Sequence, residues 1–220
     1  MLKGALLGVG NVAVGGHLPG WRSRAGVEIV AGADARPERR ALLHKSFPEA
    51  RWYDTAEDLL ARETLDFVDI CTPPWAHAAL VRSALERSIH VLCEKPLILS
   101  PEELRGLPAL AADKDRTLCT VHNWLHSPAL AQMTERVRAG ALGDVRRVAW
   151  ETLRDQPAAA AGDHDNWRVD PARAGGGILM DHGWHALYCL SAWLPGEPRR
   201  VAARLETRKH TQWKVEDTAT

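Results

Sequence analysis

The sequence predicts an α/β protein, with a doubly wound parallel sheet in its first part and an α+β domain with an incomplete antiparallel sheet in its second. Short apolar runs alternate with amphipathic helical patterns up to about residue 121, as in right-handed β-α-β units. Beyond residue 121 the alternation stops and two strong helical patterns follow. The 220 residues exceed the roughly 100–200 that one domain needs. We therefore predict two domains, at residues 1–121 and 122–220.

The elements of the first domain follow from the hydrophobic pattern. Apolar runs predict strands at residues 4–9, 27–33, 51–53, 67–71, 90–93 and 117–121. Amphipathic patterns predict helices at residues 37–46, 56–62, 76–87 and 101–112. The helix after the first strand is expected to be short or kinked, because Gly15, Gly16, Pro19 and Gly20 have low helix propensity.

The second domain starts with a predicted helix at residues 128–139, which Gly140 and Gly143 end. A strand is expected at residues 145–152, followed by a polar stretch without a clear period. A second helix is predicted at residues 178–194 and a half-exposed strand at residues 201–207.

Composition narrows the class of protein. Lys plus Arg and Asp plus Glu both number 28, a neutral balance that argues against binding to nucleic acid or to an anionic membrane surface. No apolar run approaches the roughly 20 residues of a membrane span, and the first residues are too short for a secretory signal. The four cysteines are widely spaced, which predicts buried, reduced thiols. We therefore expect a cytoplasmic protein.

A glycine-rich turn follows the first predicted strand. Residues 8–13, Gly-Val-Gly-Asn-Val-Ala, match G-x-G-x-x-G/A. In this pattern the first glycine permits a tight turn, the second lets the backbone approach a pyrophosphate, and Ala13 keeps the helix close to the sheet. Asp34 ends the next predicted strand, where a carboxylate can accept hydrogen bonds from the ribose hydroxyls of NAD. These features predict a Rossmann domain that binds a dinucleotide; the alternative is a structural turn and a surface aspartate.

The choice between NAD and NADP depends on charges near Asp34. The carboxylate favours NAD because it repels a 2′-phosphate, whereas Arg36, Arg39 and Arg40 could neutralise one. We predict NAD, with NADP as the alternative.

Lys95 lies in a Glu-Lys-Pro sequence at the end of the fifth predicted strand. Ligands of open α/β sheets bind at the carboxyl ends of strands, and an ammonium there can stabilise the charge that develops on a reacting oxygen. We therefore predict that Lys95 is catalytic; the alternative is an ordinary exposed lysine.

Asp181 and His185 lie four residues apart on the predicted second helix, so they share a face. A carboxylate one turn from an imidazole suits acid–base catalysis, although such a pair can also merely solvate a helix. His122 with His126 and His182 with His185 have spacings that could bind zinc. Because no H-E-x-x-H motif or cysteine cluster accompanies them, we predict no metal site.

Four segments together resemble the Gfo/Idh/MocA oxidoreductase family, which contains glucose–fructose oxidoreductase and inositol dehydrogenase. They are residues 8–13, 70–77 (Ile-Cys-Thr-Pro-Pro-Trp-Ala-His), 90–96 (His-Val-Leu-Cys-Glu-Lys-Pro) and 175–185 (Gly-Gly-Gly-Ile-Leu-Met-Asp-His-Gly-Trp-His). The resemblance runs from residue 2 to the last residue.

The resemblance implies a role for each matching residue. Lys95 would hold the substrate hydroxyl and assist proton transfer, Asp181 would support it, and His185 would be the general acid/base. The expected cofactor-binding residues are Gly8, Gly10, Asn11, Val12, Asp34, Arg39, Thr72, Pro73, His77, Glu94 and Lys95. The expected substrate-binding residues are Asn123, Trp124, Trp167 and Arg168, since a Trp face suits the C–H surface of a sugar. The Lys95–Pro96 bond is expected to be cis.

The implied activity is hydride transfer between a nicotinamide cofactor and a secondary alcohol or ketone of a sugar, cyclitol or similar polyol. Alternatives are a non-catalytic dinucleotide-binding sensor or an inactive truncated homologue. Family members are considerably longer, so we expect a C-terminally truncated chain in which the sheet of the second domain is incomplete. A homo-oligomer formed through that sheet is the expected assembly.

Overall fold

The computed structural model describes residues 1–154, 166–194 and 196–220. These residues form two compact units, Met1–Val121 and His122–Thr220. Residues 155–165, which belong to the polar stretch noted above, and residue 195, which directly follows the predicted second helix, lie outside the described residues. Among the described residues, no helix combines the length and the apolar character that crossing a membrane requires.

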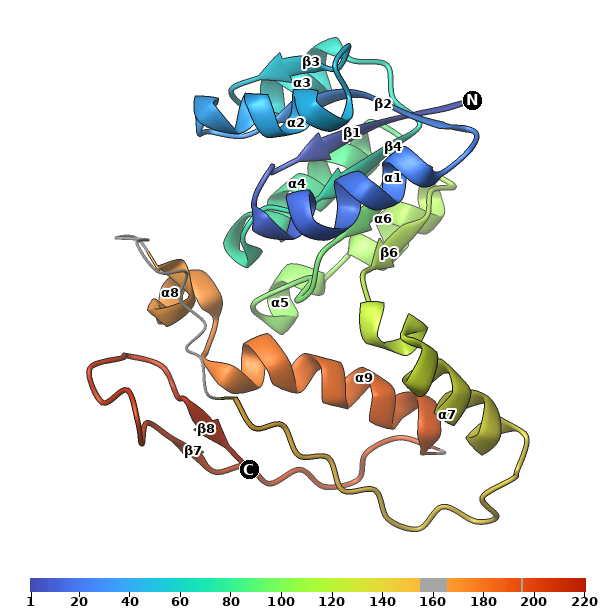
Figure 1. Cartoon of the computed structure of the whole chain (residues 1–220), viewed down its shortest axis with the longest axis vertical. Helices are drawn as coiled ribbons and strands as arrows, with labels where there is room; N and C mark the ends of the chain where they lie inside the picture. Colours follow the sequence, from blue (N-terminus) through green and yellow to red (C-terminus); the bar gives the residue numbers. More distant parts are fainter. Residues whose placement is uncertain (155–165, 195) are drawn as a thin grey trace. The chain divides into compact units, whose positions relative to one another are not determined.

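The first unit is built on a six-stranded sheet whose pairs are all parallel (Figure 1). Its strands stand in the order β3-β2-β1-β4-β5-β6, which is the order of dinucleotide-binding doubly wound sheets. In chain order the strands are β1 (Leu2–Leu7), β2 (Val27–Ala33), β3 (Arg51–Tyr53), β4 (Phe67–Ile70), β5 (His90–Cys93) and β6 (Leu118–Thr120).

Helical segments connect these strands. They are η1 (Ala13–His17), α1 (Leu18–Ser23), η2 (Pro37–Arg39), α2 (Arg40–Ser46), α3 (Ala56–Arg62), η3 (Pro74–Ala76), α4 (His77–Glu86), α5 (Pro101–Leu104) and α6 (Leu107–Asp113). The helix predicted at residues 101–112 is therefore divided into α5 and α6. The division falls at Gly106, whose φ of 79° is a left-handed conformation that glycine adopts readily. The short helix expected after β1 is a π-helical turn, η1, followed by the six-residue α1.

Apolar residues cover both faces of this sheet. Ala5 and Leu7 of β1 belong to one buried cluster, which includes side chains of α3, α4 and α6. Leu6, between them, belongs to a second buried cluster, together with Leu18 and Leu43 of α1 and α2. Because successive strand residues point to opposite faces, the sheet is buried on both sides, as the predicted fold class requires.

The second unit contains mainly helices. They are η4 (Asn123–His126), α7 (Pro128–Arg138), η5 (Trp167–Val169), α8 (Pro171–Ala174), η6 (Leu179–Gly183) and α9 (Trp184–Trp193). Helices α7 and α9 pack against each other (Figure 1), and the buried Trp193 Nε1 donates a hydrogen bond of 2.8 Å to Thr134 Oγ1. A small antiparallel sheet pairs β7 (Leu205–Glu206) with β8 (Thr218–Ala219).

Two predicted strands of this unit need correction. Residues 145–152 form no strand, and the strand predicted at residues 201–207 is reduced to Leu205–Glu206. An extended segment becomes a strand only when its backbone groups pair with a neighbour, and the described residues contain no partner for residues 145–152. A local sequence pattern alone does not supply that partner.

All four cysteines are free thiols, as predicted. Cys71, Cys93 and Cys189 are buried, as predicted, whereas the prediction of burial is wrong for Cys119, which is exposed on the edge strand β6. Burial raises the pKa of the Cys71 thiol to about 12, which keeps it protonated at neutral pH.

Candidate active site

The candidate cofactor-binding residues lie at the carboxyl edge of the first sheet. Gly8 follows β1, Asp34 follows β2, Thr72 and Pro73 lie just beyond β4, and Lys95 lies just beyond β5. Because the strands are parallel and neighbouring, the loops at their carboxyl ends share one edge of the sheet. The fold therefore collects these residues from four separate segments.

The turn after β1 needs glycine at its first position. Gly8 has a φ of 90°, and a Cβ there would lie 2.7 Å from Thr72 N and 2.8 Å from Cys71 C. A side chain would thus be strained by conformation and by contact. At Gly10 the nearest atom to a Cβ would be Arg36 Nη2, at 4.0 Å. None of the described protein atoms would clash with a side chain at Gly10. A glycine at this position is therefore consistent with space that is left open for a ligand.

Asp34 is tied to this turn. Its Oδ2 accepts a hydrogen bond of 2.8 Å from the Val9 amide, and its Oδ1 accepts from Arg36 Nε at 3.1 Å. Burial would raise the pKa of Asp34, but the hydrogen bonds from Arg36 and Val9 hold it below its ordinary value. Arg39 Nη1 donates to Asn11 Oδ1 at 3.5 Å. The predicted residues Asn11, Asp34 and Arg39 therefore border one turn, with an ionised carboxylate beside it.

His77 connects two of the loops from within the unit. Its side chain is fully buried, with Nε2 2.7 Å from the Thr72 carbonyl oxygen and Nδ1 2.7 Å from that of Pro96. Burial lowers the pKa of this imidazole. The hydroxyl of Thr72 is buried and has no hydrogen-bond partner among the described residues. Such a group is costly unless it is satisfied, and a bound molecule could satisfy it.

Lys95 stands at the start of the loop after β5 and is half-buried. Its amide donates a hydrogen bond of 3.0 Å to Oε2 of Glu94. The Lys95–Pro96 peptide bond is cis, as predicted. Lys95 belongs to the first unit, whereas the other two predicted catalytic residues, Asp181 and His185, belong to the second.

In the second unit the three glycines precede the helix that carries Asp181 and His185. A Cβ on Gly177 would overlap the carbonyl group of Glu216, so a glycine is needed for this close approach. The Glu216 carboxylate accepts hydrogen bonds from the amides of Gly177, at 2.9 Å, and Leu179, at 3.1 Å. It thereby satisfies backbone donors at the start of η6. Nothing in the sequence near Gly177 points to this distant partner.

Asp181 lies in the π-helical turn η6, and its side chain is 28% exposed. Its Oδ2 is 4.0 Å from Arg168 Nε and 3.8 Å from His182 Nε2. The guanidinium of Arg168 lies over the ring of Trp167, 4.4 Å from its centroid. The predicted substrate residues Trp167 and Arg168 are thus brought next to Asp181.

His185 lies in the first turn of α9 and is 5% exposed. The ring of Trp124 stacks on it with centroids 4.3 Å apart and an interplanar angle of 9°. The Tyr188 hydroxyl is 2.6 Å from His185 Nδ1 and accepts the Trp124 amide at 3.1 Å. Tyr188 and the η4 segment, which begins at Asn123, therefore fix the plane and one nitrogen of the imidazole.

Sequence reasoning missed Tyr188. The signal was present, because residues three apart on a helix are neighbours and a tyrosine hydroxyl can both donate and accept.

The edge of the first sheet fits a dinucleotide. It offers a glycine turn open at Gly10, an ionised carboxylate after β2 and an unsatisfied buried hydroxyl at Thr72. A helix that begins at the turn, where the Val14 amide bonds to the Gly10 carbonyl, directs its first N–H groups toward the same edge.

Comparison with known proteins agrees with this geometry. A model described as an oxidoreductase family with an NAD-binding Rossmann fold matches residues 2–122. The GFO/IDH/MocA C-terminal domain matches residues 130–220.

Individual relatives extend over nearly the whole chain. D-apiose dehydrogenase of Paraburkholderia graminis is 31% identical over 99% of this chain and 56% of its own length. An oxidoreductase from Agrobacterium radiobacter, solved with NAD⁺, L-tartaric acid and magnesium, has a TM-score of 0.80 at 26% identity and covers 99% of this chain and 61% of its own. GenD2 from gentamicin A biosynthesis, solved with NAD, has a TM-score of 0.82 at 25% identity, covering 99% and 60%.

The chain thus spans little more than half the length of these relatives. The sheet order, the glycine turn and the two matching family models lead to one conclusion. This chain belongs to the Gfo/Idh/MocA family of oxidoreductases, and its first unit is the NAD-binding Rossmann domain of that family.

Proposed function

We propose that the protein is an NAD-dependent dehydrogenase that interconverts a secondary alcohol and a ketone on a sugar, cyclitol or similar polyol. The observation that carries this proposal is the combination of a dinucleotide turn with Lys95 on one sheet edge and a helix bearing Asp181 and His185. A relative that acts on apiose, by its name, supports a carbohydrate substrate. NADP is the alternative cofactor.

We assign the two units different tasks. Residues 1–121 would bind the dinucleotide, and residues 122–220 would bind the substrate and contribute to contacts between subunits of a homo-oligomer. Aromatic residues near the predicted catalytic residues support the second assignment, because aromatic rings suit the C–H surface of a sugar. Trp124 stacks on His185, and Trp167 lies under the guanidinium of Arg168, which is 4.0 Å from Asp181.

Oxidation of the alcohol requires that its carbon lose a hydride and its hydroxyl lose a proton. The nicotinamide ring, when bound, accepts the hydride. Lys95 would hold the hydroxyl oxygen and stabilise the negative charge that develops on it, as an ammonium does for an oxyanion. The Asp181 carboxylate, 28% exposed and beside Arg168, would support Lys95 by accepting hydrogen bonds from the bound substrate.

His185 would take up the hydroxyl proton. Its Nδ1 faces the Tyr188 hydroxyl at 2.6 Å, so we assign the proton transfer to Nε2. A hydroxyl oxygen can accept a hydrogen bond from Nδ1–H both before and after Nε2 is protonated. Tyr188 would therefore support both states of the base, and the stacked Trp124 would hold its plane.

The environment of Asp34 supports NAD over NADP. Its carboxylate is ionised and stands directly after β2, where it would repel a 2′-phosphate. Arg36 is paired with this carboxylate at 3.1 Å and Arg39 with Asn11 at 3.5 Å, so neither charge is directed to a phosphate alone.

Steady-state assays with a panel of polyols and either NAD or NADP test this proposal through the absorbance of the reduced nicotinamide. We expect Lys95→Ala and His185→Ala to lower kcat by about 100-fold or more. Tyr188→Phe should lower it by about tenfold, because it removes one hydrogen bond to the base. Lys114→Ala, at an exposed lysine directly after α6, is the matched control and should retain full activity.

Two results would contradict the proposal in different ways. Full rates in both Lys95→Ala and His185→Ala would refute the assigned mechanism while leaving a dehydrogenase. Tight NAD binding by calorimetry without turnover of any substrate would favour a dinucleotide-binding sensor.

A further inference from the structure

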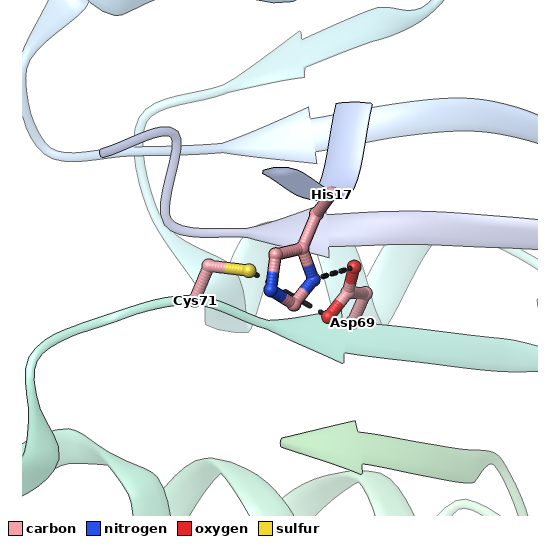
Figure 2. A group of neighbouring side chains, drawn as sticks. All are labelled: His17, Asp69 and Cys71. Atoms are coloured by element: carbon pink, nitrogen blue, oxygen red, sulfur yellow. Dashed lines mark hydrogen bonds and ion pairs between the residues drawn. The ribbon is translucent and has the colours of Figure 1, made fainter. Parts of the chain in front are cut away.

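His17 lies between two carboxylates under the loops at the carboxyl edge of the first sheet. It ends η1, and its Nδ1 is 2.8 Å from Oδ2 of Asp69, in β4. Its Nε2 is 3.0 Å from Oε1 of Glu94, directly after β5. The three side chains are 11%, 0% and 11% exposed, respectively. Figure 2 shows the imidazole of His17 with Asp69 and Cys71.

This arrangement is an ion pair of one imidazolium with two carboxylates. Ionised carboxylates only accept hydrogen bonds, so each ring nitrogen must carry a proton to satisfy the oxygen that it faces. Burial alone would lower the pKa of His17, but hydrogen bonds with Asp69, Cys71 and Glu94 outweigh burial and raise the pKa to about 12. Glu94 has a lowered pKa in the same contact, against the effect of its burial.

His17, Asp69 and Cys71 also place three possible metal-ligand atoms within 4.8 Å of one another. The measured contacts fit hydrogen bonds better. Two ligand atoms of one tetrahedral zinc ion, each about 2.1 Å from it, lie roughly 3.4 Å apart. The 2.8 Å between Nδ1 and Oδ2 is shorter than that and is an ordinary hydrogen-bond length. The Trp21 indole also donates to this oxygen, at 2.6 Å.

The second oxygen of Glu94 extends the chain of contacts to Lys95. Glu94 Oε2 accepts the Lys95 amide at 3.0 Å, while Oε1 is held by His17. A carboxylate fixed at one oxygen by a charged partner has little freedom to turn the other away. A continuous path therefore leads from Asp69, in the core of the sheet, through His17 and Glu94 to the peptide group of Lys95.

We propose that His17 is a positioning residue for Lys95, acting by fixing Glu94 so that it holds the Lys95 amide. The inference rests on the catalytic role of Lys95 in the proposed function. This inference gives His17, at the end of η1, a role that is separate from dinucleotide binding. His17 itself touches neither substrate nor cofactor in this role.

Amide hydrogen exchange of the full chain, followed by ¹H–¹⁵N NMR, tests the link without any need for activity. We expect His17→Gln to accelerate exchange of the Lys95 amide about tenfold or more, because its acceptor is released. The matched control is Trp21→Phe. It removes another donor to Asp69 and keeps a ring against Phe67, but leaves the contact between His17 and Glu94 in place, so Lys95 exchange should stay within about twofold of the original rate.

Unchanged Lys95 exchange in His17→Gln, or equal acceleration in both variants, would overturn the proposal. If His17→Gln does not fold, Glu94→Gln decides. This isosteric change removes the charge of one of the two carboxylates that face His17, leaves the His17–Asp69 contact in place, and weakens the hold of His17 on residue 94. Unchanged exchange of the Lys95 amide in this variant would also overturn the proposal.

Kinetics provide the second readout. In His17→Gln we expect kcat to fall about tenfold while KM for NAD rises by no more than about threefold, since the glycine turn and Asp34, which are expected to hold the dinucleotide together with Glu94 and Lys95, keep their contacts. A raised KM with unchanged kcat would count against positioning. If the original protein shows no turnover, the proposed function fails, yet the exchange result still decides whether His17 fixes Lys95.

Discussion

His17 and Glu94, near the carboxyl edge of the first sheet, stay charged although burial alone would favour their neutral forms. His17 and Glu94 stabilise each other's charged forms, and Asp69 lies on the other side of the imidazole. The sequence around His17 and the sequence around Asp69 contain no motif that indicates a contact between the two residues. Their pairing depends on β4 and β5 being neighbours, and no local pattern in the sequence contains that information.

This ion pair predicts how stability depends on pH. The pKa of His17 is raised in the folded state, so its contribution is complete below the ordinary value of 6.5 and is lost as pH rises toward about 12. The pKa of Glu94 is lowered, so its contribution is present above the ordinary value of 4.5 and is lost as pH falls. We therefore expect urea unfolding to show stability decreasing from pH 6.5 upward, by up to about 1.4 kcal/mol per pH unit.

The same measurement on His17→Gln is the control. Its stability should be lower at pH 6.5 and should vary less with pH on the alkaline side, because the group that titrates is gone. An equally steep decline in this variant would assign the effect to other groups.

At the scale of elements, the two glycines of the turn after β1 have different roles. Gly8 is required by the fold, whereas Gly10 leaves space for a ligand. Gly8→Ala should destabilise the protein by about 2–4 kcal/mol, since its φ is 90° and its Cβ would contact the loop after β4. Gly10→Ala should change stability by about 0.5 kcal/mol or less but weaken NAD binding. Urea unfolding and calorimetric titration measure the two effects. Loss of stability in Gly10→Ala, or full NAD affinity in that variant, would contradict this division.

Elements differed in how well the sequence predicted them. The strands at Val27–Ala33 and His90–Cys93 were predicted correctly to the residue, because buried parallel strands are largely apolar runs between turns. The half-exposed edge strand Arg51–Tyr53 was also predicted to the residue, from a weaker pattern. The strand predicted at residues 145–152 was wrong, because a local sequence pattern says nothing about a partner strand. The two π-helical turns could not be predicted from the sequence, because one extra residue in a single turn changes the apolar period of a helix too little to be detected.

The residues of the candidate site could likewise be predicted only in part. Residues at strand ends, such as Gly8, Asp34 and Lys95, could be predicted to share an edge, because topology alone places them there. Contacts made by side chains across the fold, such as Glu216 with the amides of Gly177 and Leu179, depend on tertiary packing. The catalytic assignments of Lys95, Asp181 and His185 remain predictions until kinetics test them.

For the molecule as a whole, two compact units predict two thermal events. Calorimetry should resolve a transition of the first unit that NAD raises, because a ligand that binds only the folded state stabilises it by about 2.7 kcal/mol at 100 times Kd. For a unit of this size the shift should be about 10 °C. The Gly10→Ala variant should show a smaller shift at the same NAD concentration. No transition responding to saturating NAD would contradict dinucleotide binding by this chain.

The two π-helical turns also have a genetic consequence. A π turn can be regarded as an α-helix into which one residue has been inserted, and here such turns contain His17 and Asp181. Deletion of a single codon within residues 13–16 would restore the α-helical register and rotate His17 by about 100° about the helix axis relative to the preceding turn. So small a change in the gene would separate the imidazole from Asp69 and Glu94. It would also turn Leu18, the next residue of the helix, away from its buried cluster.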